Sequence, residues 1–173
     1  MITPDQEKWL AHLQDDNCTV ILPHDPKAAE KFERIKKLIA SLIGSSVPVH
    51  HCGASSMGIS GQGELDIYIP VSAEKFDSML IPLEDIFGKP GSVYALDRAR
   101  FVTRIDGAKA EIFLVNEKGR SWTDGCRFEG YLKSHPDALA AYAKMKEEGN
   151  GLSTQAYYRR KTEFINGILS KAA

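Results

Sequence analysis

The sequence predicts an α/β (α+β) fold, in which a small mixed β-sheet with flanking helices is followed by a helical C-terminal third. Strand and helix patterns alternate up to about residue 116, whereas only helical periodicity follows. A length of 173 residues is typical of one domain. We therefore expect residues 1–173 to form a single domain, with its core at about 18–116 and its helical part at about 123–170.

The composition argues against several classes of partner. Hydrophobic residues make up 43% of the chain and charged residues 26%, which is typical of a globular protein. Lys and Arg number 22 against 23 Asp and Glu, whereas proteins that bind duplex nucleic acid usually carry a basic surplus. The chain shows no leader-type segment and no apolar run of the roughly 20 residues that span a bilayer. We expect a cytoplasmic protein without a duplex nucleic acid or membrane partner, and no oligomeric state is predicted.

The N-terminal quarter predicts two helices with a short strand between them. The first helix covers Thr3–Leu13 and the strand covers Cys18–Leu22. Asp25 and Pro26 begin the second helix as its cap and its first residue, and Gly44 ends it. The apolar residues of this helix recur at spacings of 4, 3, 4 and 3 on one face, and they are Ala28, Phe32, Ile35, Ile39 and Leu42.

The centre of the chain predicts two strands around a loop rich in glycine and serine. Val47–Cys52 precedes the loop at residues 53–63, and Glu64–Val71 follows it. Apolar and polar residues alternate along Glu64–Val71, so we expect them on opposite faces of the strand. Ala73–Phe87 then predicts a helix interrupted at Pro82, because proline lacks the amide hydrogen that a helix needs.

A hairpin and further helices complete the prediction. Phe101–Ile105 and Ala108–Val115 flank the dipeptide Asp106-Gly107, a strong signal for a tight turn between antiparallel strands. Three helices are predicted after it, at Asp124–Lys133, at Pro136–Glu148 and from a cap at Ser153 onward.

The glycine- and serine-rich loop and the two acidic residues that follow it suggest a binding or catalytic site. The glycines of the 53–63 loop would let backbone amides approach a phosphate. Glu64 and Asp66 lie two residues apart on the following strand, so their side chains point the same way with Cβ atoms ~7 Å apart. That spacing suits two carboxylates that share a divalent cation. The alternative interpretation gives these residues no functional role: the loop only connects two strands, and the acids lie on the solvent-exposed face of a sheet that is covered on one side.

The hairpin offers a third acid and several arginines. Glu111 lies among apolar neighbours, either at an exposed edge or in a buried polar site. Arg98, Arg100 and Arg104 share strand parity, so they would either bind a triphosphate or form the solvent face of the sheet. Lys161 on the last helix is open to the same two interpretations, as a phosphate ligand or as a surface lysine.

Six separated motifs carry a resemblance to a known family. They are Leu22-Pro23-His24-Asp25-Pro26, His51-Cys52-Gly53-Ala54-Ser55-Ser56, Leu65-Asp66-Ile67, Arg127-Phe128-Glu129-Gly130-Tyr131-Leu132-Lys133-Ser134-His135-Pro136, Ala141-Tyr142-Ala143 and Lys161-Thr162-Glu163-Phe164-Ile165. In this order they resemble the GrpB family over about Val20–Leu169. The resemblance implies a nucleotidyltransferase-like fold, in which a strand, a Gly-Ser turn and a helix hold triphosphate and acids on the next strand hold Mg²⁺.

The chain departs from that superfamily pattern at three positions. Ala54 stands where serine is common, Gln62 where a lysine precedes the acidic strand, and Tyr68 where a second acid follows Asp66. Because of the last departure, we expect Glu64 to supply the second carboxylate.

The resulting prediction is a Mg²⁺-dependent nucleotidyltransferase that acts on a nucleotide or another phosphorylated small molecule. Its catalytic residues are Asp66, Glu64 and Glu111, its metal ligands are Asp66 and Glu64, and its phosphate ligands are Gly53, Ser55, Ser56, Arg104 and Lys161. A module that binds nucleotide or phospho-ligand without catalysis is the first alternative, suggested by Ala54 and Tyr68. A protein-interaction domain is the second, with a face on the C-terminal helices and Trp122.

Overall fold

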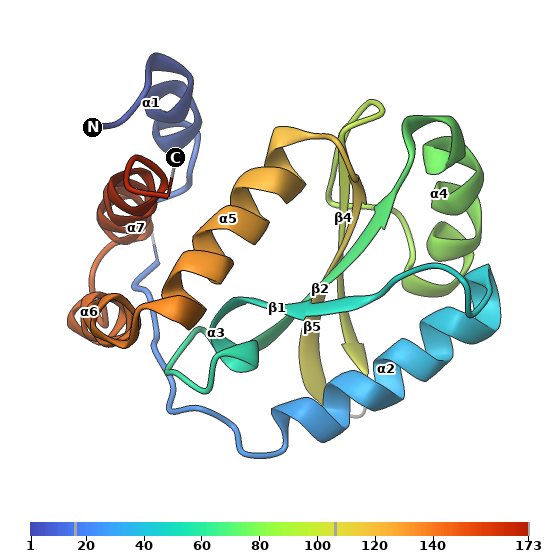
Figure 1. Cartoon of the computed structure of the whole chain (residues 1–173), viewed down its shortest axis with the longest axis horizontal. Coiled ribbons are helices and arrows are strands. Elements are labelled where there is room, and N and C mark those ends of the chain that lie inside the picture. The colour runs from blue at the N-terminus through green and yellow to red at the C-terminus, as the bar shows by residue number, and fades with distance from the viewer. Residues whose placement is uncertain (16, 106, 173) are drawn as a thin grey trace. The chain divides into compact units, whose positions relative to one another are not determined.

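The computed structural model describes residues 1–15, 17–105 and 107–172, and Figure 1 traces the chain. Its described residues form one five-stranded mixed sheet and seven helices. The predicted mixed α/β fold with a helical C-terminal region is therefore confirmed.

The chain divides into two compact units. The sheet unit consists of His24–Ile59 and Gly63–Gly125, and the helical unit of Met1–Pro23, Ser60–Gln62 and Cys126–Ala173. The boundary between Gly125 and Cys126 falls within the helix Arg120–Ser134. The single domain expected from the chain length stays a prediction.

The sheet is mixed, with one parallel pair among its four pairs of neighbouring strands. In chain order the strands are β1 (His50–Cys52), β2 (Glu64–Val71), β3 (Ser92–Tyr94), β4 (Arg98–Ile105) and β5 (Ala108–Asn116). Their order in space is β1-β2-β5-β4-β3. Only the β2–β5 pair is parallel, and the other three pairs are antiparallel. A distant strand is thereby brought next to the acidic strand β2, which the local pattern of β2 does not predict.

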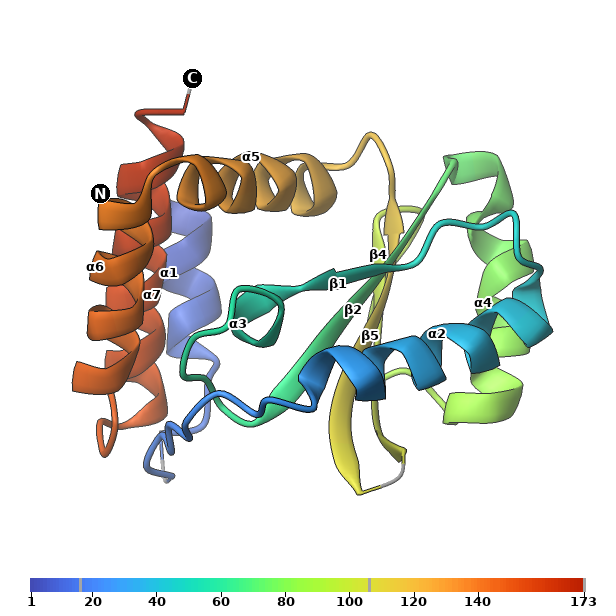
Figure 2. The same ribbon diagram turned by 60° about the horizontal axis from the view of Figure 1, so that its bottom comes forward.

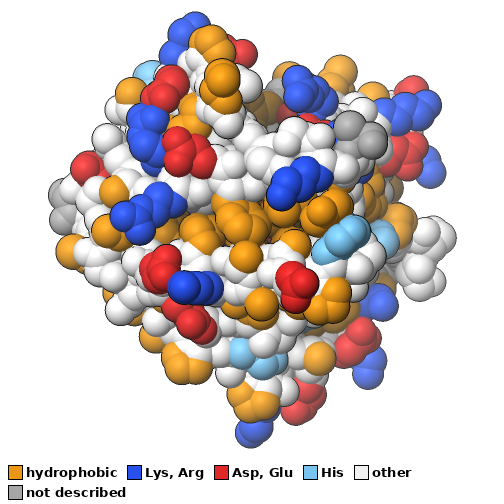
Figure 3. Space-filling view, turned by 60° about the vertical axis from the view of Figure 1, so that its left-hand side comes forward, with side chains coloured by type: hydrophobic (Ala, Val, Ile, Leu, Met, Phe, Trp, Pro, Cys, Tyr) orange, Lys and Arg blue, Asp and Glu red, His pale blue; other side chains and the backbone are white. Residues whose placement is uncertain are grey.

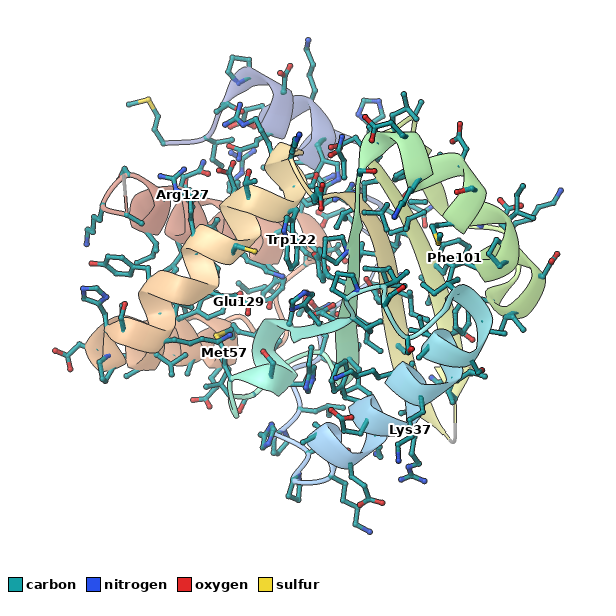
Figure 4. All side chains as sticks on the ribbon, turned by 45° about the vertical axis from the view of Figure 1, so that its right-hand side comes forward. Lys37, Met57, Phe101, Trp122, Arg127 and Glu129 are labelled. Atoms are coloured by element: carbon teal, nitrogen blue, oxygen red, sulfur yellow. The ribbon has the colours of Figure 1, made fainter. Side chains whose placement is uncertain are left out.

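Two helices cover one face of this sheet, α2 (Ala28–Ile43) and α4 (Ala73–Phe87), as Figure 1 shows. Their apolar residues and those of the strands make the main core, where Phe101 lies on the side of α4 (Figure 4). The buried core residues of α2 and β2 are among those that the periodicity predicts, and only Leu42 of the predicted set is half-buried instead; the buried ones are Ala28, Phe32, Ile35, Ile39, Leu65, Ile67, Ile69 and Val71. The polar residues of β2 therefore belong to the opposite face.

Four local expectations need correction. Cys18–Leu22 forms no strand, because only isolated bridges at Cys18 and Leu22 pair with other segments. Helix α4 continues through Pro82, since Phe76 and Leu83 are buried on either side of it and packing outweighs the missing hydrogen bond. Helix α2 begins at Ala28 rather than at Pro26, and α5 (Arg120–Ser134) begins four residues before the predicted start.

The hairpin between β4 and β5 is confirmed on the described residues. Ile105 and Ala108 are paired at its end, and Gly107 has the positive φ of 76° that the turn requires. Asp106, the other predicted turn residue, lies outside the described residues. The short helix α3 (Gly53–Ser56) lies where the family resemblance implies a helix after the Gly-Ser turn, whereas the short edge strand β3 was not predicted.

The helical unit packs α1 (Pro4–Ala11), α6 (Pro136–Glu148) and α7 (Thr154–Leu169) side by side (Figure 2). Glu7 on α1 accepts two hydrogen bonds from Arg159 on α7, at 2.6 and 2.7 Å. Tyr142 and Phe164 join α6 to α7 with ring centroids 5.3 Å apart. The predicted cap at Ser153 is confirmed, since its hydroxyl accepts from the amide of Ala156.

Candidate functional site

The face of the sheet opposite α2 and α4 carries the polar residues of β2 and β5. Glu64 and Asp66 lie on this face because they alternate with the buried apolar residues of β2. The parallel register then places Glu64 beside Lys109 and Asp66 beside Glu111. These four residues belong to the sheet unit, so the pairing of β2 with β5 fixes their backbone positions relative to one another.

Three carboxylates converge on this face. One oxygen from each of Glu64, Asp66 and Glu111 lies within 4.8 Å of the other two. Glu111 is only 8% exposed, and the side chain of Glu64 is 14% exposed. Carboxylates are seldom buried without a cation or a metal to compensate for the lost hydration. The interpretation of Glu111 as a member of a partly buried polar site is therefore confirmed, and the exposed-edge interpretation is wrong.

Two cationic side chains compensate the acids. Arg100 donates two hydrogen bonds to Glu111, at 2.8 Å from Nε and 2.5 Å from Nη2. Lys109 donates to Glu64 at 2.5 Å, and its ammonium lies 3.7 Å from Glu111. The acids and the two cationic side chains thus form one ion network on this face of the sheet.

The chemistry and spacing of the three acids fit a hard divalent cation. Carboxylate oxygens are the ligands that Mg²⁺, Ca²⁺ and Mn²⁺ prefer. With bonds of about 2.1 Å, Mg²⁺ joins opposite ligands about 4.2 Å apart, and Ca²⁺ with bonds of about 2.5 Å joins ligands about 5 Å apart. The limit of 4.8 Å between the oxygens lies in the upper part of this range. The spacing of the three oxygens is therefore compatible with one shared divalent cation.

The turn at Gly53 lies directly against Asp66. Gly53 has φ +72°, and a Cβ atom there would lie 2.0 Å from Oδ2 of Asp66. Such a distance is impossible for a real side chain, so only glycine allows the turn and the carboxylate to lie this close. Cys52, the last residue of β1, is the register partner of Asp66. The structure thus brings the predicted glycine and the predicted metal ligand together.

The two predicted serines make local hydrogen bonds. The Ser56 hydroxyl donates to the carbonyl of Gly53 at 2.9 Å, which closes the single turn of α3. Ser55 Oγ lies 2.9 Å from Nε2 of His51, whose ring stacks on Phe32. His51 therefore faces α2, while His50 faces the other way and is exposed, as their alternation predicts. The phosphate-binding roles of Ser55 and Ser56 stay predictions.

An aromatic cluster continues the polar face beyond the acids. Tyr68 stacks on Phe113, with ring centroids 4.6 Å apart. The ring centroid of Trp122 on α5 lies 5.9 Å from that of Tyr68 and 5.1 Å from that of His50. Figure 4 shows Trp122 on the side of α5 that faces the sheet. Tyr68, two residues after Asp66, is thus part of a packed aromatic cluster. Glu64, two residues before Asp66, lies close to both Asp66 and Glu111, and its predicted role as the second metal ligand stays a prediction.

Two further phosphate ligands were predicted, and they lie in different units. Arg104 is exposed on β4 and is the register partner of Lys109, so it extends the row that starts at Glu64. Arg98 and Arg100 share its face, as their parity predicts. Lys161 belongs to the helical unit, where its ammonium lies over the ring of Tyr158, 5.5 Å from the centroid. The roles of Arg104 and Lys161 in phosphate binding stay predictions.

Lys109 was not predicted as a site residue, and Arg100 was not predicted to be a partner of the acids. Lys109 shares strand parity with Glu111, so it belongs to the same face as that acid. Its contact with Glu64 depends on the parallel pairing of β2 with β5, 45 positions later in the chain. The parity was readable from the sequence, whereas the pairing was not.

Two other expectations concern partners and location. On the face drawn in Figure 3, Lys and Arg side chains are interspersed with Asp and Glu, which agrees with the balanced composition. Within the part of the chain that the structure describes, no helix combines the length and the apolar character needed to cross a membrane.

Comparisons with known proteins now give the context of this geometry. The structure is similar to the crystal structure of the conserved protein GrpB from Enterococcus faecalis, with a TM-score of 0.70 and 18% sequence identity. The match covers 88% of this chain and 96% of that chain, and at this identity it shows a shared fold. No curated protein matches the sequence. A family model described as GrpB protein matches residues 19–171, nearly the whole length, and the chain therefore belongs to the GrpB family.

Proposed function

We propose that this protein binds a nucleoside triphosphate through a divalent cation and transfers the nucleotidyl group to an acceptor. The observation that carries the proposal is the convergence of Glu64, Asp66 and Glu111 within 4.8 Å on one face of the sheet. The close approach of Gly53 to Asp66 supports it, because a turn rich in backbone amides then lies beside the cation ligands.

The residues of the site have distinct tasks in this proposal. The three carboxylates hold Mg²⁺, which when bound supplies Lewis-acid stabilisation of the charge on the phosphates. Gly53, Ser55 and Ser56 bind the triphosphate from the turn after β1. Arg104, on the same face, compensates the charge of the departing group.

The reaction balances without a further reactant. The acceptor oxygen forms a bond to the α-phosphorus, and the bond from that phosphorus to the β-phosphate oxygen breaks. Pyrophosphate leaves with the electron pair, and the proton of the acceptor passes to water. The site has to align the acceptor with the leaving group and stabilise charge, which is how enzymes accelerate transfer of phosphorus groups.

A specific observation favours one alternative, a module that binds a nucleotide or phospho-ligand without catalysis. Tyr68 fills the position of an acid and packs against Phe113 and Trp122. Glu64 and Glu111 already have cationic partners in the protein. A site that keeps phosphate binding but holds its cation weakly would show both features.

The test combines binding and turnover. Calorimetry with ATP or GTP in the presence of Mg²⁺ should show binding to the wild-type protein, and Asp66→Asn should weaken it at least about tenfold, because a first ligand of the cation is lost. Glu117→Gln is the matched control, since this exposed acid follows the end of β5. Unchanged binding by Asp66→Asn would remove the metal assignment.

Labelled substrate separates the two functions. With ATP or GTP labelled at the α-phosphate and either Mg²⁺ or Mn²⁺, release of pyrophosphate with label on an acceptor or on the protein supports the transferase. Binding without any transfer supports the binding module instead.

A further inference from the structure

The ammonium of Lys109 lies close to two of the three acids of the cluster. Its Nζ atom is 2.5 Å from Oε2 of Glu64 and 3.7 Å from Oε1 of Glu111, two of the three acids of the cluster. Two positive charges a few ångströms apart in a half-buried site repel each other strongly. A metal ion and the ammonium of Lys109 therefore compete for the same oxygens.

Arg100 differs from Lys109 in how it is held. Its planar guanidinium makes two hydrogen bonds to Glu111, a geometry that fixes both side chains. The two side chains are about equally exposed, but Lys109 is a point charge on a flexible four-carbon stem and makes no such paired, planar contact with one carboxylate. Rotation of this stem moves the ammonium away from Glu64 without disturbing the strand. Lys109 is thus the cation that can be exchanged, whereas Arg100 keeps Glu111 in position.

The same face offers a second place for this ammonium. Arg104 is the register partner of Lys109, so a phosphate group bound at this row would meet both cations. Phosphate oxygens attract an ammonium as a carboxylate does. When a metal ion displaces Lys109 from Glu64, phosphates bound with the metal ion offer Lys109 a new anionic partner. A free metal ion offers Lys109 no such partner.

We propose that Lys109 couples the cation to the phosphates, so that the site selects a metal–polyphosphate complex over the free metal ion. This inference rests on the proposed function, because it assigns a task to a residue beside the same carboxylates. In the arrangement of this structure Lys109 neutralises Glu64 and Glu111, and in the complex it binds the phosphates. By reciprocity, the metal ion then raises the affinity for the phosphates by the same factor as the phosphates raise the affinity for the metal ion.

The test measures Mn²⁺ binding by the loss of the signal of free Mn²⁺ in electron paramagnetic resonance. Titrations are made with Mn²⁺ alone and with Mn²⁺ plus ATP or tripolyphosphate. Lys109→Met should bind Mn²⁺ alone about tenfold more tightly than the wild-type protein, because the competing charge is gone. ATP and tripolyphosphate should tighten Mn²⁺ binding in the wild-type protein and do so far less in Lys109→Met.

Two further variants make the result specific. Lys118→Met removes the same charge beyond the other end of β5 and should leave Mn²⁺ binding unchanged. Lys109→Arg keeps the charge and should bind Mn²⁺ alone as weakly as the wild-type protein. Thermal unfolding of each variant checks that it folds.

The outcomes separate this inference from the proposed function. Equal or weaker Mn²⁺ binding by Lys109→Met would overturn the role of Lys109 and leave the metal site standing. Absence of Mn²⁺ binding in both the wild-type protein and Lys109→Met would overturn the metal site and this inference with it. An effect of ATP that tripolyphosphate does not reproduce would also overturn the inference, because the coupling would then come from the nucleoside.

Discussion

Replacement of Gly53 by alanine tests how the turn after β1 supports the carboxylates. At φ +72° an alanine costs about 1–2 kcal/mol relative to glycine, because its Cβ atom approaches the backbone. The same Cβ atom would lie 2.0 Å from Asp66 Oδ2, so the carboxylate has to move. Forcing that side chain away from its rotamer costs a further 0.5–1.5 kcal/mol or so. Gly53→Ala should therefore lower the free energy of unfolding by about 1.5–3.5 kcal/mol.

Gly58 provides a control with nearly the same backbone. Its φ is +71°, and an added Cβ atom meets no heavy atom of the described chain within 4 Å. Gly58→Ala should lower the free energy of unfolding by only about 1–2 kcal/mol. Urea unfolding followed by circular dichroism measures both variants, and Mn²⁺ titration measures the site. Only Gly53→Ala should lose Mn²⁺ affinity, and equal effects of the two substitutions on stability and on binding would refute the reasoning.

Two further predictions concern stability away from the acids. Gly149→Ala would place a Cβ atom 2.5 Å from the buried ring of Tyr157, so it should lower the free energy of unfolding by about 1–3 kcal/mol in urea, whereas Gly130→Ala, in open space on α5, should raise it by up to about 1 kcal/mol. Equal effects of the two substitutions would contradict the contact with Tyr157. The hydrogen bond from Lys31 holds the pKa of the Asp25 carboxyl below its usual value. At a pH above the pKa that Asp25 has in the unfolded chain, the carboxylate therefore stabilises the fold. This stabilisation is lost as the pH falls through the lower pKa that Asp25 has in the folded protein. Thermal unfolding from pH 7 to pH 2 should show Asp25→Asn less stable at pH 7 and the difference from wild type vanishing in acid, and a constant difference would be inconsistent with this assignment.

The local pattern predicted the acid-bearing strand well. Period-2 alternation along Glu64–Val71 is enough to place Glu64 and Asp66 on one face, because every second side chain of a strand points the same way. The spacing of the α2 residues likewise predicts which side of that helix is buried. These features depend on residues a few positions apart, which is the range over which periodicity carries information.

The contacts that complete the cluster could not be predicted in the same way. Glu111 joins Asp66 only because β5 pairs in parallel with β2, and that choice of neighbour depends on the packing of the whole sheet. The pairing of Lys109 with Glu64 follows from the same register. At Pro82 the local sequence predicts an interruption, because proline usually breaks a helix. Helix α4 nevertheless continues through Pro82, because the packing of the helix outweighs this local preference.

The most direct test of the cation site is a crystal of the wild-type protein soaked in Mn²⁺ and measured for anomalous scattering. The account predicts a peak about 2–2.5 Å from the carboxylate oxygens of Glu64, Asp66 and Glu111. In the same map the ammonium of Lys109 should have moved away from Glu64. A map without a peak between these three acids, with Lys109 still bonded to Glu64 at saturating Mn²⁺, would contradict the account.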